Sequence, residues 1–222
     1  MTRTDVQKLY SRTGGRWWGP FRAVWELCTS RQAKAVLESL LRRYVTPETR
    51  ILDLGCGTGT NLGRLLRLGL PFGRYTGVDF SSSMLALARK RFGDTPGVTF
   101  LEADATTLED NGERYDAIVG TWLLDHLSEP VSFVNGIQRF LAPGGHLLLM
   151  FYSRPRWFLR LWLSPLGRSL VLADPVPERE VSRFSGVLLK KTYSAGVVTL
   201  IDIAASGGGR SRLPTGRLQG SI

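Results

Sequence analysis

The sequence predicts an α/β fold, in which helices cover both faces of a mostly parallel sheet. From Arg50 onward, short runs rich in Leu, Ile and Val alternate with stretches of helical periodicity, which is typical of such a sheet. The 222 residues suffice for one domain with added flanks, and the 43% hydrophobic and 22% charged fractions are those of an ordinary globular protein. We therefore expect one main domain at residues 50–205.

An N-terminal helical cap is expected at residues 1–49. Apolar residues between Val24 and Leu41 recur at helical spacing, and this stripe ends near Thr46 and Pro47. The cap therefore places one long helix before the alternating region.

Seven strands are expected after this cap. They lie near residues 50–54, 74–79, 98–101, 115–120, 146–152, 187–193 and 197–204. Helices fill intervals between them at residues 61–68, 82–91 and 131–140, and a serine at 81, 82 or 83 is suited to cap the second. Only residues 194–196 separate the last two strands. Because this link is too short for a parallel crossover, one strand of the pair must run antiparallel to its neighbour.

Two segments stand apart from this alternating pattern. In residues 154–176, Arg156 and Arg160 share a helical face beside an apolar surface that contains Trp157. Such a segment suits a lid over a ligand site or contact with a membrane through 154–172, and a helix packed on the core is the alternative. Residues 206–222 are rich in Gly, Arg and Ser with little to bury, so a disordered tail is expected.

The net charge of +10 is concentrated in the flanks. Residues 1–50 hold ten Lys and Arg against four Asp and Glu, residues 51–150 hold eight against eleven, and residues 151–222 hold eleven against four. The flanks also carry five of the six tryptophans. Basic residues among aromatic ones suit an anionic surface, either lipid or nucleic acid, although a generally arginine-rich proteome would give the same composition.

The cysteine count and the hydropathy bear on location. Cys28 and Cys56 are the only cysteines, which excludes a Cys-cluster zinc site and gives no reason to invoke an oxidising compartment. The longest apolar run, from Leu147 to Tyr152, is far shorter than the roughly 18 residues of a membrane-spanning helix. We expect a cytoplasmic protein without a metal, in peripheral contact with the inner membrane surface where the basic flanks meet lipid.

The strongest local motif is ILDLGCGTGTN at residues 51–61, an apolar strand followed by a glycine turn and a helix. Gly55, Gly57 and Gly59 permit left-handed backbone and let a ligand lie against the helix N-terminus. A dinucleotide-binding turn requires glycine at position 60, where Thr60 stands, so a nicotinamide or flavin oxidoreductase is disfavoured. The Lys-Ser/Thr pair of a P-loop is also missing.

Two acids follow the next two strands. Asp79 stands in GVDFS after the second strand, and Asp104 stands in FLEADATTL after the third. An acid at the second position is suited to accept both hydroxyls of a ribose, and one at the third is suited to accept an adenine amino group. Together with the glycine turn they predict an adenosine pocket.

Five segments in order, ILDLGCGTGTN, GVDFSSSMLALARKR, FLEADATTL, YDAIVGTWLLDHL and LAPGGHLLL, resemble the class I S-adenosylmethionine-dependent methyltransferases over roughly residues 45–152. The resemblance implies a Rossmann-like seven-stranded sheet in the order 3-2-1-4-5-7-6 with strand 7 antiparallel, and S-adenosylmethionine as the cofactor. GVDFSSSML and TYSAGVVTLIDIA are similar to the ubiquinone/menaquinone-type (methyltransferase type 11-like) members. The Trp-rich N-terminus and the segment from Arg154 depart from that group.

The resemblance also implies which residues contact the cofactor. Asp79 would hold the ribose, Phe80 and Met84 would flank the adenine, and Asp53 and Thr121 would lie near the methionine portion. Structural alternatives remain for the acids, which can cap turns, and for the methionine, which can belong to the core. The full set implied is Asp53, Gly55, Cys56, Gly57, Gly59, Asp79, Phe80, Met84, Asp104, Ala105 and Thr121.

The acceptor side is expected just after the fourth strand. Methyl transfer needs alignment and an electron-rich acceptor, and requires no protein nucleophile. Asp125 and His126 follow the strand, and His126 is suited to act as general base assisted by Asp125, or else only to shape the pocket. The strand ends in Gly120-Thr121-Trp122-Leu123, without the Asp/Asn-Pro-Pro-aromatic motif of amino-methylating nucleic-acid enzymes.

The sequence therefore predicts methyl transfer from S-adenosylmethionine to a small, lipophilic molecule. Two alternatives stay open: an RNA methyltransferase that uses the basic flanks, and a non-catalytic cofactor-binding partner subunit. Nucleic acid is the less favoured partner. The acceptor atom, the oligomeric state and the role of the tail are left open.

Overall fold

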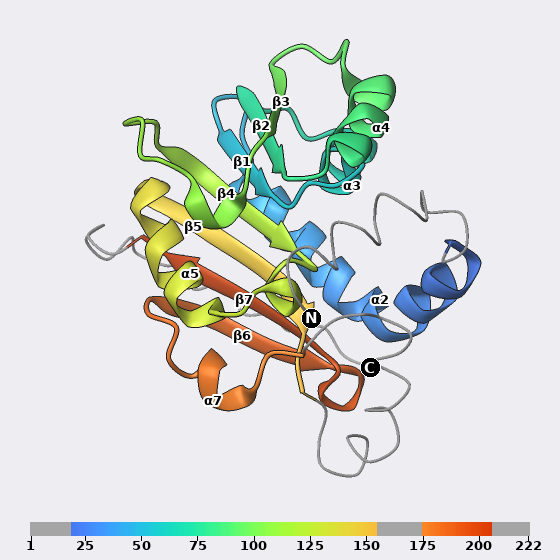
Figure 1. Ribbon diagram of the computed structural model, residues 1–222, viewed down its shortest axis with the longest axis vertical. Coiled ribbons are helices and arrows are strands. Elements are labelled where there is room, and N and C mark those ends of the chain that lie inside the picture. The colour runs from blue at the N-terminus through green and yellow to red at the C-terminus, as the bar shows by residue number, and fades with distance from the viewer. Residues whose placement is uncertain (1–18, 155–174, 206–222) are drawn as a thin grey trace.

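The computed structural model describes the backbone of residues 19–154 and 175–205, and their side chains from Thr29 onward. The predicted tail, nearly all of the predicted 154–176 segment and the start of the predicted cap lie outside the described residues. Within them, a seven-stranded sheet carries helices on both faces (Figure 1). Its strands are β1 (Arg50–Leu54), β2 (Arg74–Asp79), β3 (Val98–Glu102), β4 (Tyr115–Thr121), β5 (Leu141–Tyr152), β6 (Val187–Tyr193) and β7 (Val198–Ala204).

The strand order is β3-β2-β1-β4-β5-β7-β6, as the family resemblance implied. Strand β7 pairs antiparallel with β5 and with β6, and the other neighbouring strands are parallel. The short turn Ser194–Gly196 joins β6 to β7, which confirms the antiparallel pair expected from so short a link. The predicted α/β fold class is therefore confirmed.

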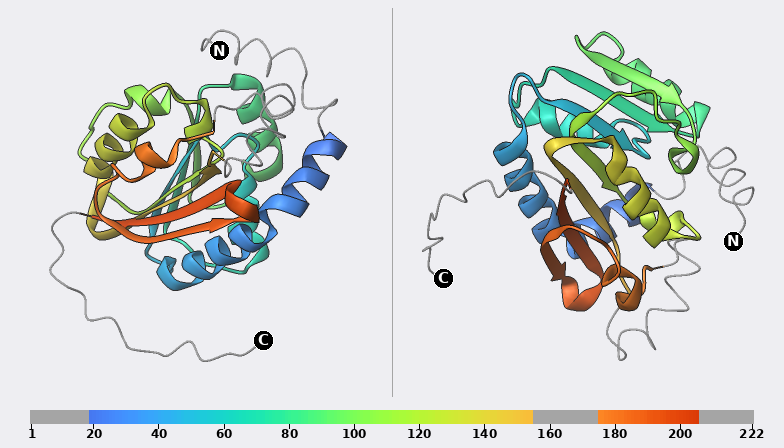
Figure 2. Two further views of the ribbon diagram at one scale, coloured as in Figure 1. Left: turned by 90° about the horizontal axis from the view of Figure 1, so that it is seen from below. Right: turned by 90° about the vertical axis from the view of Figure 1, so that its left-hand side faces the viewer.

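The helices lie on opposite sides of the sheet. Helices α2 (Gly19–Tyr44), α3 (Thr60–Arg67) and α4 (Ser82–Phe92) cover one face, and α5 (Pro130–Ile137) and α7 (Glu178–Val181) cover the other (Figure 2). Of the three serines suited to cap the second predicted helix, Ser81 does so: its hydroxyl accepts a hydrogen bond from the Met84 amide at 3.4 Å.

Strand β5 differs from the prediction at its start. It begins at Leu141 rather than near residue 146, because Leu141 already pairs with Tyr115 of β4. The register then shifts, and Gly144 adopts φ 76°, before regular pairing resumes at His146. The Pro-Gly-Gly sequence thus forms an irregularity inside the strand. The helix expected over 131–140 is α5 followed by a separate 3₁₀ turn at Gln138–Phe140.

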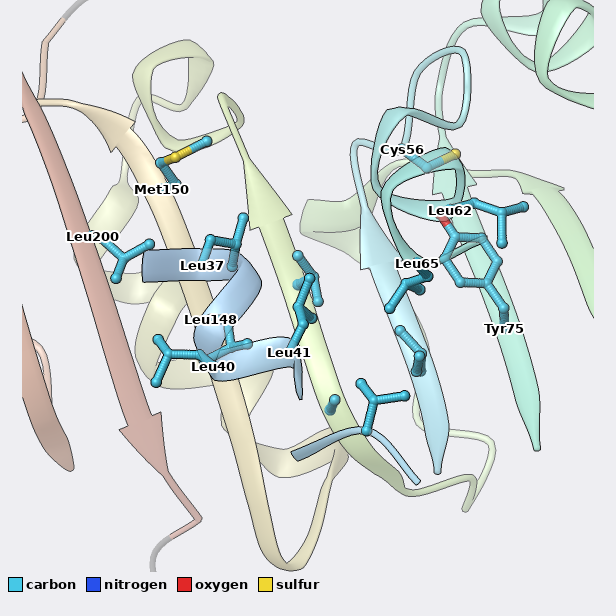
Figure 3. Packing of buried hydrophobic residues seen from close by; sticks show 14 of the residues in the cluster. Leu37, Leu40, Leu41, Cys56, Leu62, Leu65, Tyr75, Leu148, Met150 and Leu200 are labelled. Atoms are coloured by element: carbon cyan, nitrogen blue, oxygen red, sulfur yellow. The ribbon is translucent and has the colours of Figure 1, made fainter. Parts of the chain in front are cut away.

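Two apolar layers enclose the sheet. On one face, the leucines of α2 and α3 pack over β1, β2, β5 and β7 (Figure 3). Leu148 and Met150 of β5 point into this layer, whereas Leu147, Leu149 and Phe151 point into the layer under α5 and α7. A central strand covered on both faces has no solvent side, which explains why its sequence is continuously apolar rather than alternating.

Replacing two of the glycines by alanine should change the free energy of unfolding in opposite directions. A Cβ at Gly77 in β2 would lie 2.9 Å from the Phe100 ring and 3.0 Å from the Cys56 sulfur, whereas a Cβ at Gly136 in α5 would meet nothing within 4 Å. We expect Gly77→Ala to lower the free energy of unfolding by about 1–3 kcal/mol through overpacking. Gly136→Ala should raise it by about 0.5–1 kcal/mol. Urea denaturation of both variants checks this, and equal effects would contradict it.

Candidate functional site

The sequence-predicted site residues gather at one edge of the sheet. The parallel strands β1, β2, β3 and β4 all end there: β2 and β4 end in Asp79 and Thr121, β1 leads into the glycine turn, and β3 leads to Asp104. Strand β1 has β2 as its neighbour on one side and β4 on the other, so the strand order reverses direction at β1. Ligands of open α/β sheets bind at such a switch point, outside the carboxyl ends of the strands.

The three glycines of the turn have different reasons to lack a side chain. Gly55, Gly57 and Gly59 all adopt left-handed backbone, with φ of 63°, 54° and 80°. A Cβ at Gly59 would lie 2.8 Å from the Phe92 ring, so this glycine lets α3 approach α4. A Cβ at Gly57 would meet nothing within 4 Å. Gly57 therefore leaves room above the turn, where a ligand can approach the backbone.

Asp79 ties the end of β2 to the glycine turn. One carboxylate oxygen accepts a hydrogen bond from the Gly57 amide at 2.8 Å, and the other accepts one from the Ser81 amide at 2.9 Å. Burial raises the pKa of Asp79, against the two amides that favour its charged form. Each carboxylate oxygen can accept a further hydrogen bond, so the group is suited to bind a hydroxyl as well.

Asp104 caps a 3₁₀ turn at Ala105–Thr107. Its carboxylate accepts hydrogen bonds from the amide of Thr106 at 2.9 Å and from the hydroxyl of Thr106 at 2.8 Å. This is the structural role that the sequence left as an alternative for this acid. Contact with adenine stays a prediction for Asp104 and Ala105, as it does for Phe80 and Met84, which are all partly buried at the same edge.

Asp53 is enclosed beneath the turn and is 0% exposed. Its two oxygens accept hydrogen bonds from the Asn61 amide nitrogen at 2.9 Å and from the Tyr75 hydroxyl. Asn61 also donates to the Thr121 hydroxyl at 3.1 Å. The residue-by-residue prediction missed Asn61, although it is the last letter of the ILDLGCGTGTN motif. It joins the end of β1 to the end of β4.

The cysteine of the turn faces the interior. The Cys56 thiol is buried and lies close to where a Gly77 side chain would begin. Burial raises the pKa of this thiol, and the nearby Asp53 and Asp79 raise it further. A thiol held protonated in the core is unsuited to covalent catalysis. Only the backbone of Cys56 is available to line the turn.

The end of β4 carries a strained tryptophan. Trp122 has φ 59°, which is unusual for a bulky residue and costs conformational energy. Its amide donates to the Met150 carbonyl at 2.7 Å, and its ring lies 4.5 Å from the Tyr152 ring, centroid to centroid. Asp125 and His126 follow in a 3₁₀ turn at Leu124–His126, with Asp125 buried. The predicted acceptor-side residues therefore lie directly after Thr121.

Two features are absent from the described residues: a metal-binding cluster and a membrane-spanning helix. No group of three or more His, Cys, Asp and Glu side chains is placed to hold a metal ion. No described helix combines the length and the apolar character needed to cross a membrane.

Asp53 should make stability depend on pH. Burial raises its pKa from 3.8 to about 6, so between those values the folded chain holds a proton that the unfolded chain has released. This carboxyl therefore lowers the free energy of unfolding as pH rises from 4 to 6. We expect Asp53→Asn, compared with the wild type, to gain stability across that interval and then stay level, as measured by urea denaturation. A difference that does not change with pH would refute the assignment.

The comparisons with known proteins agree with this geometry. Residues 51–145 match the family model described as a methyltransferase domain. The chain is 30% identical over 151 residues to the demethylmenaquinone methyltransferase of Clavibacter sepedonicus, across 68% of this chain and 56% of that protein. It is 32% identical over 133 residues to the 2-phytyl-1,4-naphtoquinone methyltransferase of Thermosynechococcus vestitus, across 55% and 58%.

The chain thus spans just over half the length of these two relatives. Among solved structures, it superposes on the CMeT domain of the citrinin polyketide synthase with a TM-score of 0.61 and 27% identity, across 92% of this chain and 56% of that one. The matched residues, the strand order and the glycine turn agree with one another: the chain is similar to the class I S-adenosylmethionine-dependent methyltransferases and, within them, to the quinone-type members.

Proposed function

We propose that the protein transfers the methyl group of S-adenosylmethionine to a small, lipophilic acceptor. The observation that carries this proposal is the hydrogen bond between the Gly57 amide and the Asp79 carboxylate. This bond joins the glycine turn, which has open space at Gly57, to an acid that can accept hydrogen bonds from hydroxyl groups. Both lie at the edge of the sheet where ligands of such folds bind. An adenosine-containing cofactor needs both features side by side.

The residues at the edge fit the parts of S-adenosylmethionine. Asp79 would accept the ribose hydroxyls, Phe80 and Met84 would flank the adenine, and the Asp104–Ala105 pair would meet its edge. The backbone of the turn, from Gly55 to Gly59, would line the middle of the cofactor. The methionine portion would then lie toward Asp53 and Thr121. When bound, the cofactor would supply a methyl group to the acceptor by in-line displacement, in which the carbon–sulfur bond breaks and S-adenosylhomocysteine is the leaving group.

The acceptor would lie beyond Thr121, against Trp122. The Trp122 side chain is half-buried, and its ring lies against the buried ring of Tyr152. An apolar or conjugated molecule suits such a surface. His126, in the following turn, would accept a proton from the acceptor, and Asp125 would orient it.

A lipophilic acceptor agrees with the relatives, two of which are named as methyltransferases of demethylmenaquinone and of a phytyl naphthoquinone. The predicted membrane contact through 154–172 lies almost wholly outside the described residues and remains a proposal. An RNA acceptor gains no support from the described residues, since nothing at the end of β4 replaces the missing nucleic-acid motif.

Loss of the Asp79 carboxylate should weaken cofactor binding. Hydrogen bonds to a charged group contribute about 1.5–3 kcal/mol, so Asp79→Ala should weaken S-adenosylmethionine binding at least about tenfold. Calorimetric titration measures this, with NADH as a ligand that should not bind. Asp94→Ala removes an exposed acid after α4 and should bind like the wild type. A folded wild type that fails to bind S-adenosylmethionine would overturn the proposed function.

His126 should affect turnover rather than cofactor affinity. We expect His126→Asn to lower methyl transfer to a naphthohydroquinone by about 10²–10⁴-fold, the usual contribution of a general base. Its affinity for S-adenosylhomocysteine should stay within twofold of the wild type. His146→Asn is the matched control, because the chain has two histidines and His146 pairs with Ala117 near the start of β4, away from the carboxyl end that His126 follows. Full activity of His126→Asn would leave His126 only a pocket-shaping role.

A further inference from the structure

A chain of polar side chains runs beneath the glycine turn, from α2 to the end of β4. The Glu38 carboxylate of α2 lies 3.5 Å from the Arg64 Nε of α3. Arg64 Nη1 donates a hydrogen bond to Asn61 Oδ1. Asn61 Nδ2 in turn donates to Asp53 Oδ1 at 2.9 Å and to Thr121 Oγ1 at 3.1 Å. Arg64 is only 5% exposed and Asn61 only 4%.

The guanidinium determines which way the Asn61 carboxamide faces. A carboxamide has an oxygen that accepts and a nitrogen that donates, and a guanidinium can only donate. Arg64 therefore fixes the oxygen of Asn61 on its own side and directs the nitrogen toward Asp53 and Thr121. Without Arg64 the amide is free to turn, and its oxygen would then face the Asp53 carboxylate and repel it. The direction of one amide thus depends on one buried cation.

Attachment of α3 to α2 does not account for a buried arginine. Arg67, one turn further along α3, already pairs with the same Glu38 at 2.6 Å, from a side chain that is 64% exposed. Burying a second guanidinium is costly unless it is fully hydrogen-bonded. What Arg64 adds beyond Arg67 is its bond to Asn61. The Arg64 charge also lowers the pKa of Asp53, against the larger effect of burial, and so favours the ionised carboxylate.

We propose that Arg64 and Asn61 are positioning residues for the methionine end of the cofactor, an inference that rests on the proposed function. Arg64 orients Asn61, and Asn61 holds the Asp53 carboxylate and the Thr121 hydroxyl in place. Because Thr121 Oγ1 accepts from Asn61, its hydroxyl hydrogen is left for another acceptor, such as the carboxylate of an amino acid. The ionised Asp53 favours a nearby ammonium group.

Two ligands distinguish positioning from general destabilisation. S-adenosylhomocysteine carries the amino-acid portion, whereas 5′-methylthioadenosine has the same adenosine without it. We expect Arg64→Met to weaken binding of S-adenosylhomocysteine at least tenfold and that of 5′-methylthioadenosine less than twofold, by calorimetric titration. Arg67→Met removes the exposed partner of Glu38 on the same helix and should change neither affinity. Asn61→Ala should repeat the selective loss.

The possible results separate the two proposals. A wild-type protein that folds but binds neither ligand would overturn the proposed function. If the wild type binds, equal weakening of both ligands by Arg64→Met would overturn the inference, as would an unchanged affinity for S-adenosylhomocysteine. Should Arg64→Met fail to fold, as judged by circular dichroism, Arg64→Lys and Asn61→Ala decide. Arg64→Lys keeps the charge but not the planar fork, so it should show a smaller loss that is still confined to S-adenosylhomocysteine.

Discussion

The fully buried side chain of Asp53 constrains the edge of the sheet at which the parallel strands end. Asp53 is the next-to-last residue of the inner strand β1, and a buried charge is tolerated only if its hydrogen bonds are supplied by the protein. The donors come from both sides: Tyr75 from β2 and Asn61 from α3, which also bonds Thr121 of β4. Two neighbouring strands and a helix are therefore fixed around one acid. The glycine turn must close tightly above it, since the same few residues connect β1 to α3.

The N-terminal helix α2 (Gly19–Tyr44) is held to the sheet at two points, Thr29 and Tyr44, and contacts the carboxyl edge between them. The Ser194 hydroxyl donates to the Thr29 carbonyl at 2.6 Å. At the opposite edge of the sheet, the Tyr44 hydroxyl donates to Asp202 at 2.7 Å, and its ring stacks on His146 at 3.6 Å, centroid to centroid. Between these anchors Glu38 reaches α3. The helix expected from sequence as a cap is thus part of the same core as the sheet.

The sequence predicted features that repeat along the chain, and missed those that depend on one residue meeting another. The positions of the strands followed from apolar runs, because a parallel sheet buried on both faces leaves a continuous pattern, whereas their order was implied by the family resemblance. The start of β5 was misplaced, since Pro-Gly-Gly usually ends an element and here forms an irregularity within one. Periodicity does not reveal which of Arg64 and Arg67 is buried, because they are three positions apart on the helix and both are next to leucines. The available signal was the i, i+3 spacing of Asn61 and Arg64.

In the proposed function, the cofactor and acceptor sides meet between Thr121, the last residue of β4, and Trp122, which follows it. Thr121 belongs to the hydrogen-bonded set around Asp53, and Trp122 turns away into left-handed backbone with its ring on Tyr152. Displacement of a methyl group is accelerated mainly by alignment of donor and acceptor, so a fixed separation between their supports is an advantage. The strained Trp122 backbone is retained because its amide bonds to Met150 and its ring packs on β5. Relaxing it would move the predicted acceptor surface relative to the cofactor site.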